Sequence, residues 1–216
     1  MQSCDIYFYK TIQYYELDRL AQYFRLFGFG EITGIDIGRE YKGTIPNTAY
    51  MNKRYGRFGW SKGSLLNFCI GQGEILVTPI QVFNYINLLA TKGNANSPHL
   101  ASSIKKESKN EISLAPQIWD RIIFDMGQVV SHAKGTGKNA DPAIQDAKIY
   151  GKTGTAENPH GEDHAWFIGW VQYEEQKFSI VVLLENSGSG GAVAAPVAKN
   201  VFNNIILGIQ NSNQIL

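Results

Sequence analysis

The segment Lys152-Thr153-Gly154-Thr155 has the residue types and the spacing that most clearly suit chemistry in this chain of 216 residues. A cation and two hydroxyls on an edge strand can bind a substrate carboxylate, and the backbone N–H groups of that strand can stabilise a developing oxyanion. The glycine lets another chain approach the backbone closely. A lone Lys152 would also suit an edge strand as a guard against aggregation, but the Thr-Gly-Thr after it favours the chemical role. We therefore expect an active-site strand here.

Ser3 and Asp5 form a second group of reactive side chains, directly before the apolar aromatic segment at residues 6–9. A nucleophilic mechanism uses a hydroxyl near a cation, and Ser3 is a candidate for that hydroxyl beside Lys152. The local sequence also supports a simpler interpretation, because Ser and Asp are favoured residues for capping the first helix. Domains seldom open on such an aromatic cluster, so we expect this start to be a cut rather than a natural boundary.

Charge and length exclude several classes of protein. The net charge is +1 and the charged residues are interspersed, so we expect no nucleic-acid partner. With 44% apolar residues the chain can bury one sizeable core, and we expect a single domain over residues 1–216. We find no apolar run in the sequence long enough to span a bilayer.

The cysteines and histidines indicate no metal or cofactor site. Cys4 and Cys69 lack the spacing of a metal or redox motif, and their apolar neighbours predict buried free thiols. His160 and His164 are close in sequence, but the proline and glycine around them indicate a turn, so we expect a solvent-facing loop. We expect neither a cofactor nor a metal. The scattered histidines are His99, His132, His160 and His164.

Alternating and continuous apolar runs predict the strands that carry the reactive residues. Three strands are expected at 147–156, 164–172 and 177–185 in an antiparallel meander, and two short strands within 97–113. The glycine-rich segment 187–191 lacks the Gly-Lys-Ser ending of a phosphate loop, and we expect a flexible strand-helix connection.

Helical periodicity predicts the elements that pack against these strands. Helices are expected at 16–27, from the capping box Thr78-Pro79-Ile80-Gln81 to Lys92, from Pro116 to Val130, and at 193–208. Residues 31–63 are expected to have little regular structure. Together the elements predict an α+β fold with helices packed on an antiparallel sheet. The residues expected on the buried faces of the last three helices are Val82, Tyr85, Ile86 and Leu89; Ile118, Ile122, Met126 and Val129 or Val130; and Val197, Val201, Ile205 and Phe202.

Several blocks in one order extend the resemblance of the Lys-Thr-Gly motif over nearly the whole chain. Together they resemble the transpeptidase domain of a class B penicillin-binding protein, most similar to the elongation type called penicillin-binding protein 2. The resemblance implies a partial penicillin-binding-protein fold and a serine D,D-transpeptidase that cross-links peptidoglycan stem peptides and is acylated by β-lactams. The blocks are Ser3-Cys4-Asp5 with residues 6–9, Phe27-Gly28-Phe29-Gly30, Thr33-Gly34-Ile35-Asp36, Gly71-Gln72-Gly73, Thr78-Pro79-Ile80-Gln81 and Lys152-Thr153-Gly154-Thr155-Ala156.

The resemblance implies a role for each motif residue. Ser3 is the hydroxyl of the family's second motif, which relays a proton near the leaving group, and Lys152 orients it with positive potential. Asp5 occupies the third position of that motif, where Asn is commoner outside the elongation type.

The same resemblance makes Thr153, Gly154 and Thr155 the substrate-binding and oxyanion residues. The two threonines would contact the carboxylate of the substrate or β-lactam, and the N–H of Thr155 would be one oxyanion donor.

The nucleophilic Ser-x-x-Lys motif of this family belongs some tens of residues before Ser3, so it is missing from this chain. Literal matches occur elsewhere, but each lacks a serine that opens a buried helix with a desolvated lysine one turn later. We therefore expect the C-terminal portion of a transpeptidase domain, catalytically silent by itself. The literal matches are Ser102 to Lys105, Ser103 to Lys106 and Ser131 to Lys134, beside a Ser108-Lys109-Asn110.

Two other functions stay open at this point. A serine β-lactamase would need a deacylating glutamate, and Glu157 follows the Lys152 motif rather than lying in the loop where that glutamate belongs. A non-catalytic binding or scaffold module would keep the carboxylate-binding strand without acylation. The resemblance implies partners among the proteins of the cell-wall elongation complex, and a longer parent at the periplasmic face of the inner membrane. The exposed apolar surface of a partial domain predicts self-association.

Overall fold

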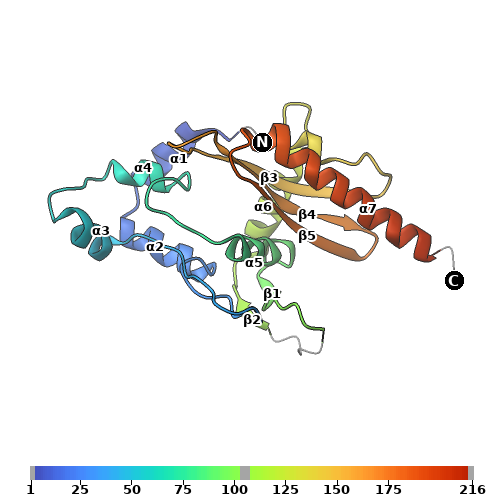
Figure 1. Cartoon of the computed structure of the whole chain (residues 1–216), viewed down its shortest axis with the longest axis horizontal. Coiled ribbons are helices and arrows are strands. Elements are labelled where there is room, and N and C mark those ends of the chain that lie inside the picture. The colour runs from blue at the N-terminus through green and yellow to red at the C-terminus, as the bar shows by residue number, and fades with distance from the viewer. Residues whose placement is uncertain (1–2, 103–107, 214–216) are drawn as a thin grey trace. The chain divides into compact units, whose positions relative to one another are not determined.

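The computed structural model describes residues 3–102 and 108–213, which divide into two compact units (Figure 1). The sheet unit comprises residues 89–92 and 113–213, and the helical unit comprises residues 3–88 and 93–112 where they are described. The expectation of a single domain over residues 1–216 stays a prediction.

The sheet unit is built on three antiparallel strands in the order β3-β4-β5. They are β3 (Lys148–Ala156), β4 (His164–Tyr173) and β5 (Gln176–Leu184). The predicted antiparallel meander is confirmed. Both ladders run without a register shift, from Lys148 opposite Gln172 to Ala156 opposite His164, and from Tyr173 opposite Gln176 to Ala165 opposite Leu184. The α+β fold class is thereby confirmed.

The helix α7 (Ala195–Asn213) covers one face of this sheet, after a π-helical turn η2 (Gly190–Ala194). Phe202 is fully buried as predicted and Ile205 is partly buried, but Val197 and Val201 are 38% and 39% exposed, so the prediction is wrong for these two valines. The face of α7 that packs on the sheet carries small alanines instead of these bulky residues, because alanines let the helix lie close to the sheet. The core on this side of the sheet contains Ala165, Phe167, Val171, Ala194, Ala195, Ala198, Phe202 and Ile206.

The helix α6 (Pro116–Ser131) has Pro116 at its start, as predicted, and buries Met126, Val129 and Val130. Ile118 was expected inside but is 47% exposed, and its neighbour Trp119 is buried in its place. The large indole buries more apolar area than the isoleucine would, which favours the helix rotation that places it inside.

The segment Gly190–Ser212 is the one helix, among the residues that the structure describes, whose length and composition would allow it to cross a membrane. The expectation that no segment of the chain spans a bilayer therefore stays a prediction. A core helix has the same composition, and this one packs Ala198, Phe202 and Ile206 in the core of the sheet unit.

The helical unit contains five helices, the last of which ends in the sheet unit, and a two-stranded sheet. Ile12, Leu17, Met51, Leu65 and Phe68 form a core in this unit. The helices are α1 (Asp5–Ile12), α2 (Leu17–Leu26), α3 (Thr48–Tyr55), α4 (Ser64–Phe68) and α5 (Pro79–Ala90), and the strands are β1 (Asn94–Asn96) and β2 (Ser108–Glu111).

Of these helices, α3 departs from the sequence prediction, whereas α2 and α5 follow it. α3 lies where little regular structure was expected; its cap is the side chain of Asn47, which accepts from the N–H of Tyr50 at 2.8 Å. The capping box of α5 is confirmed, because the N–H of Thr78 donates to Gln81 and the N–H of Gln81 donates to Thr78, at 3.0 and 3.3 Å.

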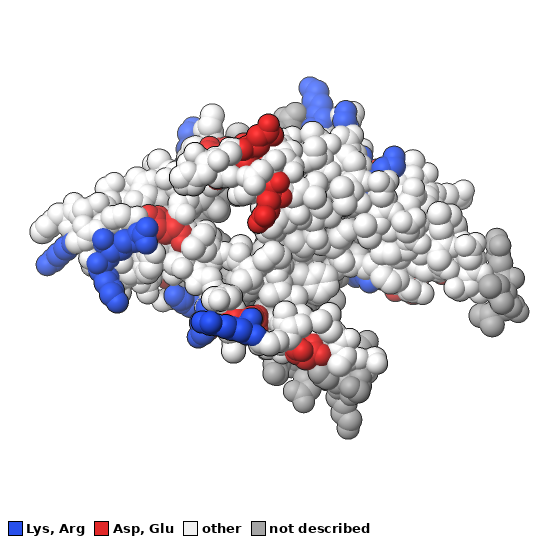
Figure 2. All heavy atoms as spheres, viewed as in Figure 1, with Lys and Arg blue, Asp and Glu red and all other residues white. Residues whose placement is uncertain are grey.

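The remaining predictions concern the cysteines and the surface charge. Both cysteines are free, but Cys4 is exposed and Cys69 only partly buried, so the prediction of buried thiols is wrong. Figure 2 shows lysine, arginine and acidic side chains on the visible face with wide uncharged areas between them.

Candidate active site

The residues Lys152 to Thr155 lie together on β3, which is an edge strand of its sheet as predicted. Their partners on β4 are Ile168, Phe167, Trp166 and Ala165, in that order. Among the described residues β3 pairs with β4 alone, so alternate backbone groups along it point away from the ladder. The strand therefore has the geometry needed to receive an extended peptide or to hold an oxyanion.

The two threonine hydroxyls lie on one side of β3 but in different surroundings. Thr153 is only 8% exposed, and its hydroxyl donates to the hydroxyl of Thr136 at 2.7 Å. Thr155 is exposed and accepts from the N–H of Gly190 at 3.4 Å. Thr155 is therefore the more accessible of the two for a carboxylate.

Thr136 is a residue of this site that the sequence analysis missed. It lies in Gly135-Thr136-Gly137 after α6, which the sequence analysis interpreted only as the end of a helix. Its hydroxyl accepts the hydrogen bond from Thr153, which lies 17 residues later in the chain. The signal in the sequence that could have identified Thr136 was a hydroxyl residue between two glycines.

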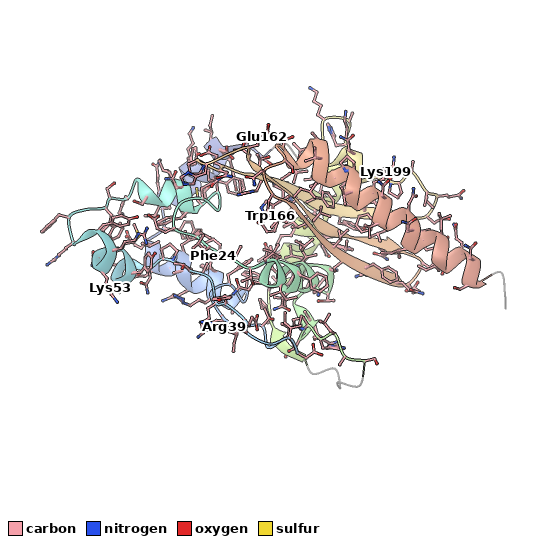
Figure 3. All side chains as sticks on the ribbon, viewed as in Figure 1. Phe24, Arg39, Lys53, Glu162, Trp166 and Lys199 are labelled. Atoms are coloured by element: carbon pink, nitrogen blue, oxygen red, sulfur yellow. The ribbon has the colours of Figure 1, made fainter. Side chains whose placement is uncertain are left out.

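The turn before α7 packs directly on the motif. A Cβ atom added to Gly190 would lie 2.2 Å from the carbonyl oxygen of Trp166 and 2.3 Å from that of Gly154. Figure 3 labels Trp166 on its strand. A Cβ atom on Gly191 would lie 2.6 Å from the carbonyl oxygen of Thr136. Where a flexible connection was expected, the chain forms a helical turn in close backbone contact with the motif.

The side chain of Lys152 is half-buried and lies on the other side of β3 from the two threonines. Its ammonium donates to the carbonyl oxygen of Thr153. The ammonium is thus held close to the strand rather than extended into solvent.

Two loops at the Thr155 end of β3 are bonded to each other. Asn158 donates to the side chain of Asn186 at 2.6 Å, and the N–H groups of Ser187 and Gly188 both donate to the carbonyl oxygen of Asp163 at 2.9 Å. Loop 157–163 and loop 185–189 are therefore joined by hydrogen bonds into one rim beside the motif.

Two histidines, His160 and His164, lie in or beside these loops. The ring of His164 accepts from the N–H of Asn186 at 3.1 Å. His160 lies in an exposed turn, which agrees with the expected loop. The described residues contain no group of three side chains that could hold a metal ion.

Ser3 and Asp5 lie at the start of α1, in the helical unit. Neither caps the helix, because the cap position is Cys4 and no side chain donates or accepts a capping hydrogen bond there. The capping interpretation is therefore wrong. Ser3 has the left-handed backbone angle φ of 46°, which is uncommon for a residue other than glycine. Lys152 lies in the other unit, so its convergence with Ser3 stays a prediction.

The literal Ser-x-x-Lys matches have no nucleophilic geometry where they are described. Ser131 ends α6, and its hydroxyl donates to the carbonyl oxygen of Gly127 at 3.0 Å. Residues 103–107, with Ser103, Lys105 and Lys106, lie outside the described residues.

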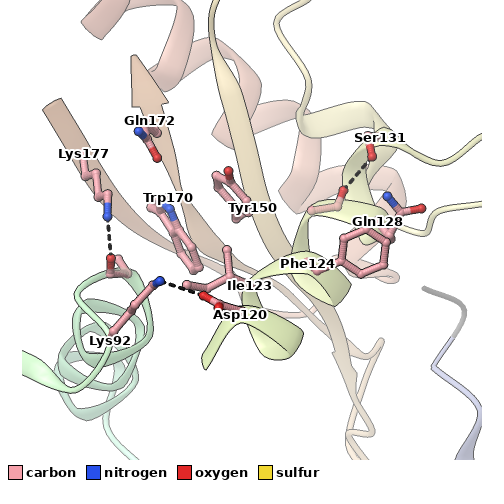
Figure 4. A pocket seen from close by; sticks show the side chains of 12 residues that line it. Lys92, Asp120, Ile123, Phe124, Gln128, Ser131, Tyr150, Trp170, Gln172 and Lys177 are labelled. Carbon is pink, nitrogen blue, oxygen red and sulfur yellow. Dashed lines mark hydrogen bonds and ion pairs between the residues drawn. The ribbon is translucent and has the colours of Figure 1, made fainter. Parts of the chain in front are cut away.

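A separate hollow of about 530 Å³ lies between α6 and the face of the sheet opposite α7 (Figure 4). Its wall includes Tyr150 stacked on Trp170, with 4.8 Å between the ring centres, and Tyr150 lies against Gly127 of α6. At its mouth Lys92 pairs with Asp120 at 2.7 Å. The stacked rings hold β3 on α6 two residues before Lys152.

Comparisons with known proteins agree with this geometry. Residues 1–203 match the family described as "Penicillin binding protein transpeptidase domain". The chain is 35% identical to the peptidoglycan D,D-transpeptidase MrdA of Haemophilus influenzae, over 93% of this chain and 34% of that protein. It is 27% identical to MrdA of Escherichia coli K12, over 98% of this chain and 37% of that protein.

Solved structures give the same result. Pseudomonas aeruginosa PBP2 in complex with WCK 5153 has a TM-score of 0.81 at 34% identity, covering 92% of this chain and 44% of that one. Helicobacter pylori PBP2, solved in complex with MreC, has a TM-score of 0.79 at 31% identity, covering 94% of this chain and 38% of that one. The chain spans about a third of the length of the curated relatives it matches.

Proposed function

Because the chain belongs to the penicillin-binding protein transpeptidase family, of the PBP2 or MrdA type, we propose that it forms part of a peptidoglycan D,D-transpeptidase of cell-wall synthesis. The observation that carries the proposal is the edge strand β3. It holds Lys152, Thr153, Gly154 and Thr155 in one extended segment, supported from behind by Thr136 and Gly190.

The reaction is acyl transfer from a stem peptide to a serine and then to an amine. Thr155, which is exposed, receives the terminal carboxylate of the stem peptide or of a β-lactam, and Thr153 supports the strand beside it. The N–H of Thr155 donates to the oxyanion. One such donor contributes about 2.7 to 4 kcal/mol in a well-studied serine protease.

Ser3 and Asp5 supply the second motif in this proposal. The hydroxyl of Ser3 relays a proton to the leaving group, and the ammonium of Lys152 holds it in the orientation for that transfer. The 216 residues contain no Ser-x-x-Lys in the position that the family uses, so the polypeptide is not acylated on its own.

The partners and location follow from the same proposal. The structure of Helicobacter pylori PBP2 was solved with MreC, which supports a cell-wall elongation protein as a partner for the parent of this chain. Cross-linking of stem peptides takes place at the periplasmic face of the inner membrane, where we place the site.

Labelling with a fluorescent penicillin tests the proposal. The 216-residue polypeptide should form no covalent adduct, as measured by gel fluorescence and intact mass. A stoichiometric adduct on one of its serines would contradict the assignment of the nucleophile. A longer product of the same reading frame that contains a Ser-x-x-Lys should be labelled.

A matched pair of lysines tests the role of the edge strand in such a product. Lys152→Ala should slow labelling by about 100-fold or more, because the group that orients the proton relay is removed. Lys148→Ala changes an exposed lysine of the same strand and should leave the rate unchanged. Equal rates for the two variants would refute the role of Lys152.

A further inference from the structure

The hydroxyl of Thr155 has a backbone partner on its acceptor side. It accepts from the N–H of Gly190 at 3.4 Å, and Gly190 is the first residue of the turn η2. A hydroxyl has one proton and two lone pairs, so a hydroxyl that accepts from the backbone keeps its proton for another group. An ionised carboxylate can only accept hydrogen bonds. The contact with Gly190 therefore leaves Thr155 as a donor, which is the state that a carboxylate needs.

The bond from Gly190 to Thr155 is long, so it depends closely on the position of the turn. N–H···O bonds in proteins usually measure about 2.7–3.2 Å. The observed 3.4 Å lies beyond that range, and a small outward shift of the turn would break the bond. Whatever holds the turn in place therefore also determines whether Thr155 keeps its donor direction.

Asn186 holds the loop that leads into this turn. Its side-chain oxygen accepts from Asn158 at 2.6 Å, and its own N–H donates to the ring of His164 at 3.1 Å. The backbone of Asn186 has a φ of 51°, a left-handed conformation that asparagine adopts more readily than most residues. Loop 185–189 is thus bonded to loop 157–163 and to the start of β4 four residues before Gly190.

Asn158, the partner of Asn186, is itself held in one orientation. Its side-chain oxygen accepts from the N–H of His160 at 3.0 Å, and its amide nitrogen also donates to the carbonyl oxygen of Glu162 at 3.4 Å. Figure 3 labels Glu162 in this loop. Because both ends of the amide have partners within their own loop, its donor to Asn186 has a defined direction.

We propose that Asn186 is a positioning residue for the carboxylate that Thr155 receives. By joining the two loops it holds the turn at Gly190, and the N–H of Gly190 keeps the hydroxyl of Thr155 directed as a donor toward the carboxylate. Asn186 acts through the turn and not by contact with the substrate. The inference rests on the proposed function, because the carboxylate at Thr155 belongs to that proposal.

Amide hydrogen exchange of the 216-residue polypeptide, followed by NMR, tests whether Asn186 holds the turn. Asn186→Gly removes the side-chain bond, and glycine adopts the left-handed backbone without strain. Exchange of the Gly190 amide should become about two- to ten-fold faster, as expected for the loss of one hydrogen bond, while the amides bonded between β4 and β5 keep their wild-type rates. An unchanged exchange rate at Gly190 overturns the proposal.

Ser187→Ala is the matched control in the same loop. The hydroxyl of Ser187 donates to the carbonyl oxygen of Glu185 at 2.8 Å, a contact within the loop that does not reach loop 157–163. This variant should leave the exchange rate of the Gly190 amide at the wild-type value. A Ser187→Ala protein with the same acceleration as Asn186→Gly would show that any change in the loop has this effect, and would overturn the role of Asn186.

Acylation by a penicillin and by its methyl ester tests the effect on the carboxylate, in the longer product that contains a Ser-x-x-Lys. The ester lacks the negative charge, so the ratio of the two rates measures recognition of the carboxylate, and a variant that only loses stability lowers both rates together. Asn186→Gly should lower the ratio about two- to ten-fold, and Thr155→Val by at least as much. Asn158→Ala should reproduce the effect of Asn186→Gly, and combining the two should add nothing, because both remove the same contact.

The outcomes separate this inference from the proposed function. A longer product that is not acylated, or that has a wild-type ratio near unity, contradicts the carboxylate at Thr155 and with it the proposed function. A ratio that Thr155→Val lowers and Asn186→Gly leaves unchanged overturns only the positioning role of Asn186.

Discussion

Gly190→Ala is the substitution by which the packing behind the motif can be tested most directly. The added methyl group would lie 2.2 Å from the carbonyl oxygen of Trp166 and 2.3 Å from that of Gly154. Reaching 3.0 Å from the nearer oxygen requires a shift of 0.8 Å, since 3.0 minus 2.2 is 0.8. Both oxygens belong to paired strands, so the turn before α7 must move away from the sheet.

The expected cost follows from the atoms involved. Overpacking in a core typically costs about 1–3 kcal/mol, and a flexible side chain that can rotate lowers the cost. Here both obstacles are backbone atoms, and the turn carries Ala194, which is fully buried in the core. We therefore expect a loss of at least about 3 kcal/mol, which for a chain of this size lowers Tm by roughly 6–12 °C.

Gly208→Ala is the matched control, because it makes the same chemical change in α7, the helix that follows the turn. A Cβ atom at Gly208 meets nothing within 4 Å. Replacing glycine by alanine inside a helix should stabilise it by about 0.5–1 kcal/mol. Urea unfolding followed by tryptophan fluorescence measures both variants. Equal stability of the two variants, or a Gly190→Ala protein as stable as the wild type, would refute the close approach of the turn to β3.

Three further substitutions test other contacts. Thr136→Val leaves the hydroxyl of Thr153 buried without its partner and should lower the free energy of unfolding by about 1–3 kcal/mol. Thr136→Ser keeps the hydroxyl and should keep most of the wild-type stability. Equal losses for the two variants in urea unfolding would count against the bond. Gln81→Leu removes the donor to the carbonyl oxygens of Glu31 and Lys42 and should cost about 2–4 kcal/mol by the same measurement. Backbone N–H groups that bond Asp36, that of Leu100 first, hold the pKa of its exposed carboxyl below the ordinary value. Its contribution to stability is present above the unfolded pKa of about 3.9 and is lost as the pH falls through the lower folded value, so Asp36→Asn should flatten the pH dependence of unfolding below about pH 4.

Local signals in the sequence were sufficient for the elements that carry the site. The three strands alternate or run apolar over their full length, and the predicted bounds differ from the observed ones by one residue at most. The start of α5 was equally predictable, because a capping box depends on residues within one turn. The same reasoning placed Lys152 to Thr155 on an edge strand.

The buried face of α7 could not be predicted in the same way. Val197, Val201 and Ile205 recur at helical spacing and are bulky, which by hydrophobicity alone favours them inside. Two alanines, Ala195 and Ala198, are buried instead, and only the sheet they pack against explains this choice. Packing density decides between two apolar faces, and the density depends on a partner that lies elsewhere in the sequence.

The support behind the motif depends on sequence separation in the same way. Thr136 bonds Thr153 from the loop after α6, and Gly190 meets Gly154 from the far end of β5. Neither contact leaves a local pattern in the sequence, because Thr136 contributes a single hydroxyl and Gly190 contributes only its lack of a side chain. Gly154 inside the motif led us to expect that another segment of polypeptide approaches the backbone there. The chain that approaches is this protein's own turn before α7, so part of the requirement for small residues here is structural. A substrate that adds to the exposed edge of β3 therefore meets a strand whose position is already held by backbone contacts on its α7 side, which lowers the conformational cost of binding in the proposed site.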